Sequence, residues 1–269
     1  MTLTGPQIDH DDIPRRLHSL FEAAKSADEC ELACALLRIR GLEDAGWDPF
    51  VETQLLVGDL TALISAPLAG HTQIRLGLLL YSHLTEVGAV YDMLANLANV
   101  IAGERYSIDP FIPHYPRNRK GEVQFLSTPK KVGVLKKMLA EIDRANIAEL
   151  LDWYFNPAVR NSFAHADYTL HEDKFRSRSE RFEIDGVLTT ELPLQALVEL
   201  VNRTLAFFEA FVTEYEQQRR SYSANKRITG RLGGQDERLP VELLADPQRG
   251  LYGLRSPPRG AAGSGTAGG

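Results

Sequence analysis

The feature that most constrains the fold of this chain is a run of apolar residues at helical spacing between Ile74 and Ala102. Apolar side chains recur there at alternating intervals of four and three residues, which places them on one face of an α-helix. We therefore expect one long helix with a buried face, ended by Gly103, because glycine suits the residue that follows a helix C-terminus. The residues of this face are Leu80, Leu84, Val87, Tyr91, Leu94, Ala98 and Ile101.

Helical periodicity recurs through most of the chain. In addition, the dipeptide Asn156-Pro157 is typical of a helix N-terminus, because asparagine caps the first turn and proline fits within it. Helices are predicted at about 13–40 (two short helices), 49–65, from about 129 onward, 147–155, 157–166 and 193–220.

A clear strand pattern is found in one part of the chain. Residues 167–178 and 181–191 are rich in aromatic and β-branched residues, and Asp185-Gly186 favours a two-residue hairpin turn. The sequence therefore predicts an all-α fold, a helical bundle with one β-hairpin, at about residues 167–191, inserted before the last long helix.

The expected organisation has three parts. Residues 1–48 are predicted to form accessory helices packed on the bundle, and residues 49–220 to form the bundle itself. Residues 221–269 hold ten of the 21 glycines, and such a segment buries too little apolar area to offset its ordering entropy. We expect a largely disordered tail in which residues 241–244 and 251–254 dock as short patches at most.

Composition excludes several classes of protein. No stretch approaches the roughly 18 consecutive apolar residues of a membrane-spanning helix, and residues 9–12 hold three aspartates where a signal peptide would be basic. Cys30 and Cys34 lack further ligands nearby for zinc, so we expect buried, reduced thiols and no metal site. The net charge of -6 argues against non-specific coating of nucleic acid but allows a local basic patch. A cytoplasmic protein that does not enter a membrane is expected.

The segment from Arg160 to His165, with the sequence RNSFAH, carries the residues best suited to chemistry. Asn161 and His165 are i, i+4 neighbours on the short predicted helix, so their side chains project from one face, and Arg160 lies one position round. Histidine transfers protons near neutral pH, and arginine presents a fork of donors to phosphate oxygens. This combination suits a phosphodiester beside a 2′-hydroxyl, without a metal ion. The alternative is a structural cluster that caps a helix end.

Arg160-Asn161-x3-His165 resembles the R-x4-6-H signature of HEPN domains, including the polar residue directly after the arginine. The order of the predicted elements over residues 51–220 is also similar to that family. The hairpin and the N-terminal helices are additions to the minimal bundle.

The resemblance implies a metal-independent RNA endonuclease that needs no cofactor and leaves a 2′,3′-cyclic phosphate. It implies a homodimer with a composite site of two facing motifs, in a prokaryotic defence or toxin–antitoxin system with an antitoxin or regulatory partner. By the motif, Arg160, Asn161 and His165 take the functional positions. Because the family also includes inactive scaffolds, the alternative is a non-catalytic module for nucleotide or partner binding and for dimerisation.

Four residues are supporting candidates. His83 and Glu86, three residues apart, interrupt a second apolar row on the long predicted helix. Such a pair either forms a hydrogen-bonded core pair or contacts the motif helix and tunes His165. Asp167 and Tyr168 directly follow the motif.

Residues 104–131 contain four prolines and are predicted to form a long loop, a kind of segment that often carries function. Cations there alternate with aromatic residues, a mixture that suits single-stranded RNA because cations follow phosphates and rings stack on bases. A solvated loop with a few docked aromatic side chains is the alternative. The RNA-binding candidates are Arg105, Tyr115, Arg117, Arg119 and Lys120.

Overall fold

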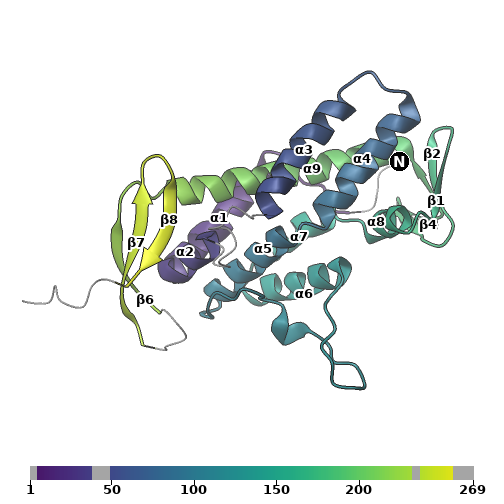
Figure 1. The fold of residues 1–269 in the computed structure, drawn as a ribbon. Coiled ribbons are helices and arrows are strands. Elements are labelled where there is room, and N and C mark those ends of the chain that lie inside the picture. The colour runs from purple at the N-terminus through teal and green to yellow at the C-terminus, as the bar shows by residue number, and fades with distance from the viewer. Residues whose placement is uncertain (1–4, 38–48, 232–236, 257–269) are drawn as a thin grey trace, which may run out of the picture.

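The computed structural model of the protein describes residues 5–37, 49–231 and 237–256. Within these ranges the helices gather around one long helix, α9, and small antiparallel sheets lie at both of its ends (Figure 1). No helix in these ranges is both long and apolar enough to cross a membrane. In chain order the helices are α1 (Asp12–Ala27), α2 (Glu29–Leu37), α3 (Pro49–Ile64), α4 (Gly70–Thr85), α5 (Gly88–Ile101), η2 (Ile112–His114), α6 (Thr128–Glu141), α7 (Ala145–Tyr154), α8 (Pro157–Ala164) and α9 (Leu194–Arg220).

The main core contains described residues from both sides of the predicted boundary at residue 48. Buried apolar residues of α1 and α2 belong to the same cluster as those of α5, α7 and α9. Leu17 and Phe21 of α1, for example, are fully buried, and Phe21 packs against Phe211 of α9 with ring centroids 6.3 Å apart. The first two helices are therefore part of the core.

The single long helix expected over residues 74–102 is wrong, because the chain forms two helices that meet at Glu86 and Val87. α4 ends at Thr85, Val87 has an extended backbone (φ -68°, ψ 91°), and α5 begins at Gly88. The hydroxyl of Tyr91 donates a hydrogen bond of 2.9 Å to the carbonyl of Thr85, which stabilises the end of α4. The apolar periodicity continues through the bend since Leu84 and Val87, on either side of it, are both buried.

The single hairpin expected at residues 167–191 is also wrong, because this segment forms two hairpins and a fifth strand. The predicted turn at Asp185-Gly186 is confirmed, with φ values of 48° and 79°, but it joins only β3 and β4. A second hairpin lies before it, and β5 pairs with β2 to complete a three-stranded sheet of order β1-β2-β5. The strands are β1 (Tyr168–His171), β2 (Lys174–Ser177), β3 (Phe182–Ile184), β4 (Val187–Thr189) and β5 (Glu191–Pro193).

The part of the expected disordered tail that the structure describes, residues 221–231 and 237–256, instead contains a third sheet, while residues 232–236 and 257–269 lie outside the described ranges. This sheet consists of β6 (Lys226–Gly230), β7 (Leu239–Asp246) and β8 (Gly250–Arg255), paired antiparallel in that order. Alternate residues of β7 point inward and join the main core, namely Val241, Leu243 and Ala245. The prediction of disorder failed because it rested on the glycine content and did not count this buried apolar area. The all-α prediction is therefore wrong, and the fold is mixed α/β with three small antiparallel sheets among the described residues.

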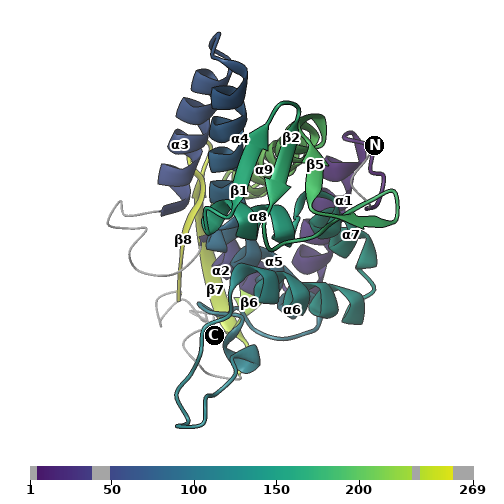
Figure 2. The same cartoon turned by 90° about the vertical axis from the view of Figure 1, so that its right-hand side faces the viewer.

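A second, smaller core lies at the end of the molecule that carries the RNSFAH segment (Figure 2). It joins α4 and the N-terminal half of α9 to the strands β2, β3 and β5, and α8 packs on it through Val159. Phe175 and Phe182 are fully buried in it, and their ring centroids are 5.7 Å apart. This cluster positions the candidate site.

Candidate functional site

The start of α8 is held by two side chains. The Asn156 side-chain oxygen accepts a hydrogen bond from the backbone nitrogen of Val159 at 3.0 Å, which confirms the predicted N-cap. The hydroxyl of Tyr81, buried in α4, accepts from the Asn156 nitrogen at 2.8 Å and donates to the Asn156 carbonyl at 3.0 Å. The position of α8 relative to α4 is therefore fixed by the Tyr81 hydroxyl, which bonds to both backbone polar groups of Asn156.

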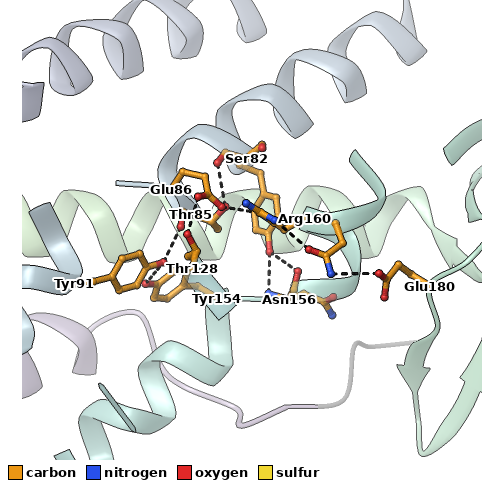
Figure 3. A network of polar contacts seen from close by, with 11 residues as sticks. Ser82, Thr85, Glu86, Tyr91, Thr128, Tyr154, Asn156, Arg160 and Glu180 are labelled. Atoms are coloured by element: carbon orange, nitrogen blue, oxygen red, sulfur yellow. Dashed lines mark hydrogen bonds and ion pairs between the residues drawn. The ribbon is translucent and has the colours of Figure 1, made fainter. Parts of the chain in front are cut away.

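Arg160 is anchored at the bend between α4 and α5 (Figure 3). Its Nε donates to Glu86 Oε1 at 2.6 Å, and the other carboxylate oxygen of Glu86 accepts from the hydroxyl of Thr128 at 2.6 Å. The side chains of Arg160 and Glu86 are 19% and 40% exposed. The hydrogen bonds of Arg160 to described residues engage Nε and one terminal nitrogen, so three of its five N–H donors make no hydrogen bond within the described ranges.

The Asn161 side chain has a defined orientation. Its oxygen accepts from a terminal nitrogen of Arg160 at 3.2 Å, and its Nδ2 donates to Glu180 Oε1 at 3.2 Å. A row of polar contacts thus runs from Thr128 through Glu86, Arg160 and Asn161 to Glu180 (Figure 3). This row joins α6, the α4–α5 bend, α8 and the loop before β3.

His165 directly follows the last residue of α8, and its backbone nitrogen donates to the carbonyl of Asn161 at 3.0 Å. The residue is exposed, and its imidazole makes no hydrogen bond to the described residues. Ala166 then takes a left-handed backbone (φ 51°) and turns the chain into β1. His165 is therefore accessible to a molecule approaching from solvent.

Asp167 and Tyr168 contact β2 and the segment that follows it. The carboxylate of Asp167 accepts hydrogen bonds from Ser179 and pairs with Arg178 at 3.0 Å, and these contacts lower the pKa of Asp167. The ring of Tyr168 stacks on Phe175 with centroids 5.1 Å apart. The structure therefore gives both residues anchoring contacts.

His83 and Glu86 are not a hydrogen-bonded pair. Glu86 contacts the motif helix through Arg160, whereas Nε2 of His83 is buried and without a hydrogen-bond partner among the described residues. Burial lowers the pKa of His83 because the charged imidazolium is poorly solvated there. Of the two, only Glu86 belongs to the polar row.

The five RNA-binding candidates are divided by the structure. Arg105 faces α2, where its Nε lies 3.6 Å from Glu31, and the hydroxyl of Tyr115 donates to Asp109. Arg117, Arg119 and Lys120 are exposed on the loop between α5 and α6, which projects away from the α3–α4 pair (Figure 2). Only the last three present their charge at this loop.

Two members of the polar row were not predicted from the sequence, Thr128 and Glu180. Thr128 is the first residue of α6, directly before Pro129. The sequence predicted that a helix starts there, but it did not predict that Thr128 contacts Glu86. Glu180 lies between β2 and β3, where no local pattern distinguishes it from other exposed acids.

Comparison of the chain with protein-family models, curated proteins and solved structures gave no match. The chemistry of α8 and its surroundings is therefore the basis for a functional proposal.

Proposed function

We propose that this protein is a metal-independent RNA endonuclease that uses 2′-hydroxyl attack and leaves a 2′,3′-cyclic phosphate. The observation that carries the proposal is the exposed imidazole of His165 at the end of α8, the helix whose first turns hold Arg160 and Asn161 in a fixed orientation. The resemblance of this segment to the HEPN signature supports the same reaction.

In this reaction the 2′-oxygen attacks the adjacent phosphorus. A bond forms between phosphorus and the 2′-oxygen, the bond from phosphorus to the 5′-oxygen breaks, and a proton moves from the first oxygen to the second. His165 transfers a proton, because imidazole does so near neutral pH. The free donors of Arg160 stabilise the more negative transition state.

Glu86 acts as a positioning residue in this proposal. It binds the Nε edge of Arg160 at 2.6 Å and so directs the remaining donors of the guanidinium group away from itself. Asn161 is held at both ends of its amide, which keeps the surface beside Arg160 fixed. A prearranged site of this kind loses little ordering entropy when a phosphate binds.

The RNSFAH segment contains one histidine and so supplies one proton-transfer group per chain; we therefore propose a homodimer in which two copies of His165 serve as base and acid. The pH–rate curve is then bell-shaped. An activity of this kind damages the host unless restrained, and we propose a prokaryotic defence or toxin–antitoxin role with an antitoxin or regulatory partner.

The test compares His165→Ala with a matched control, His171→Ala, which changes another exposed histidine on the neighbouring strand β1. Each protein is incubated with mixed RNA and EDTA, and the products are analysed for 2′,3′-cyclic phosphate. We expect His165→Ala to lower cleavage by at least about 100-fold with an unchanged thermal midpoint, because one proton-transfer group is worth about that much. Equal loss in both variants, or no cleavage by the wild type, contradicts the proposal.

A second function, a non-catalytic nucleotide- or partner-binding module, is favoured by one observation. The Arg160 side chain is only 19% exposed and is paired with the carboxylate of Glu86, which neutralises part of its charge. A partly neutralised guanidinium stabilises a transition state less, but it can still bind a phosphate. In that case Arg160→Ala weakens binding of a nucleotide or phosphorylated ligand, and no RNA is cut under any condition.

A further inference from the structure

The loop between α5 and α6 is an ordered projection. Arg117 and Val123 form an isolated antiparallel bridge, and the backbone nitrogen of Gln124 donates to the carbonyl of Pro116 at 2.9 Å. At the tip, the side-chain oxygen of Asn118 accepts from the backbone nitrogen of Lys120 at 2.8 Å. The segment thus resembles a short hairpin that projects beyond α6 (Figure 1).

Phe125 is the most exposed large apolar residue among those described, with 79% of its surface accessible. Its ring lies edge-on to Tyr115 with centroids 5.3 Å apart, and the Tyr115 hydroxyl donates to both carboxylate oxygens of Asp109 at 2.8 and 2.9 Å. The exposed ring is therefore supported from one side. A supported aromatic face in water is what an unpaired base needs for stacking.

The same projection carries three exposed cations. Arg117, Arg119 and Lys120 are exposed, and the guanidinium of Arg117 donates to the carbonyl of Gly121 at 3.0 Å. The one carboxylate within the turn, Glu122, accepts a hydrogen bond from Asn118. No ion pair engages any of the three cations within the described ranges.

The projection leads directly to the candidate site. Phe125 precedes Thr128 by three residues, a distance of at most about 11 Å along the backbone, and Thr128 binds the carboxylate that holds Arg160. The projection is therefore joined to the candidate site through Thr128, at the start of α6.

We propose that Phe125, together with Arg117, Arg119 and Lys120, forms a binding site for single-stranded RNA in which an unpaired base stacks on the Phe125 ring. The cations hold the flanking phosphates, and the strand continues to Arg160 and His165. This inference rests on the proposed function and adds to it the class of substrate, an unpaired strand rather than a duplex.

The test uses a 2′-O-methyl oligouridine, which the proposed reaction cannot cleave because its 2′-oxygen carries no proton. We expect Phe125→Ala to weaken binding of this probe by about 5- to 150-fold, the range found when a stacking residue is replaced by alanine. We expect Phe125→Trp to bind the probe about as tightly as the wild type does, and the fluorescence of the new tryptophan to be quenched when the probe binds. The matched control is Leu188→Ala, which changes a residue 69% exposed on the separate β3–β4 hairpin and leaves binding unchanged.

Several outcomes overturn the proposal. These are equal affinity of wild type and Phe125→Ala, equal weakening by Leu188→Ala, equal affinity for a duplex, and Phe125-dependent binding to phosphatidylserine vesicles instead of the oligonucleotide. Failure of the nuclease proposal looks different. If no RNA is cut but the probe binds through Phe125, the binding site stands and the catalytic role of His165 falls.

Discussion

The two ends of α9 carry small antiparallel sheets that are attached to the protein in different ways (Figure 1). At the C-terminal end, Val241 and Leu243 of β7 enter the main core together with α1 and α5. At the N-terminal end, Phe175 of β2 and Leu192 of β5 belong to the separate small cluster. One sheet is part of the main core, whereas the other forms a subsidiary core that supports α8.

The polar contacts of the two ends differ as well. At the C-terminal sheet, Asp28 and Glu31 are buried, and Arg231 and Arg238 pair with them. At the other end, the side chain of Glu86 is 40% exposed and pairs with Arg160, whose side chain is 19% exposed. Buried pairs of the first kind hold a sheet in place, whereas the pair of Glu86 and Arg160 joins α8 to the α4–α5 bend at a partly exposed position.

The largest expected effect comes from Phe175→Ala, which empties the centre of the small cluster. Removal of a buried phenylalanine costs about 3–5 kcal/mol. Because Phe175 is outside the main core, we expect hydrogen exchange to accelerate in α8, β1 and β2, while amides of α1 and α5 stay protected. Thr169→Ala, at an exposed position of β1, is the control. Uniform acceleration throughout the protein would show that the two clusters unfold as one unit.

A smaller effect is expected for Gly230→Ala at the opposite sheet. A Cβ at this position would lie 2.2 Å from Sγ and 2.4 Å from Cβ of Cys30, so β6 must move away from α2. Overpacking of this kind costs about 1–3 kcal/mol in urea unfolding. Gly253→Ala in β8 is the matched control, because its Cβ would meet Leu244 at an ordinary 3.5 Å. Equal stability of the two variants would contradict this packing.

Two replacements of Glu86 distinguish the effect of its hydrogen bonds on the position of Arg160 from the effect of its negative charge. Glu86→Gln can still accept from Arg160 and donate to Thr128, whereas Glu86→Ala loses both contacts. Either change is expected to cost under about 1 kcal/mol of stability, as for a partly exposed ion pair. We expect RNA cleavage to fall about 10-fold in the alanine variant and to be largely restored in the glutamine variant. If both variants cleave alike, Glu86 does not position Arg160.

The smallest expected effect is the pH dependence contributed by His83 of α4. Burial lowers its pKa in the folded protein, so the unfolded chain takes up more protons near the ordinary value of about 6.5. The contribution of the neutral His83 to the free energy of unfolding is complete above about pH 6.5 and is lost as the pH falls below about 6.5. Urea midpoints at pH 8 and pH 5.5 should therefore differ less in His83→Gln than in the wild type, while His171→Gln, at an exposed histidine, leaves the difference unchanged.

Local signals predicted much of the molecule. The Asn156 cap, the turn at Asp185-Gly186 and the helix start near Pro129 were all correct, because each depends on residues within one turn of chain. The short helix predicted at residues 157–166 ends at Ala164 in the structure, and the exposure of His165, just beyond it, was left open by the sequence. The apolar periodicity did not predict the bend between α4 and α5, because the pattern of buried residues continues through the bend unchanged.

The sequence by itself determined the positions of most helices and the residues that the short helix α8 carries. Only the tertiary structure decided that Thr128 and Glu180 complete the row around Arg160, that β5 pairs with β2, and that the glycine-rich segment pairs as β6 to β8. The physical reason is that these contacts join residues far apart in the chain. Their free energy is gained only when the core brings the partners together, so no local pattern records them.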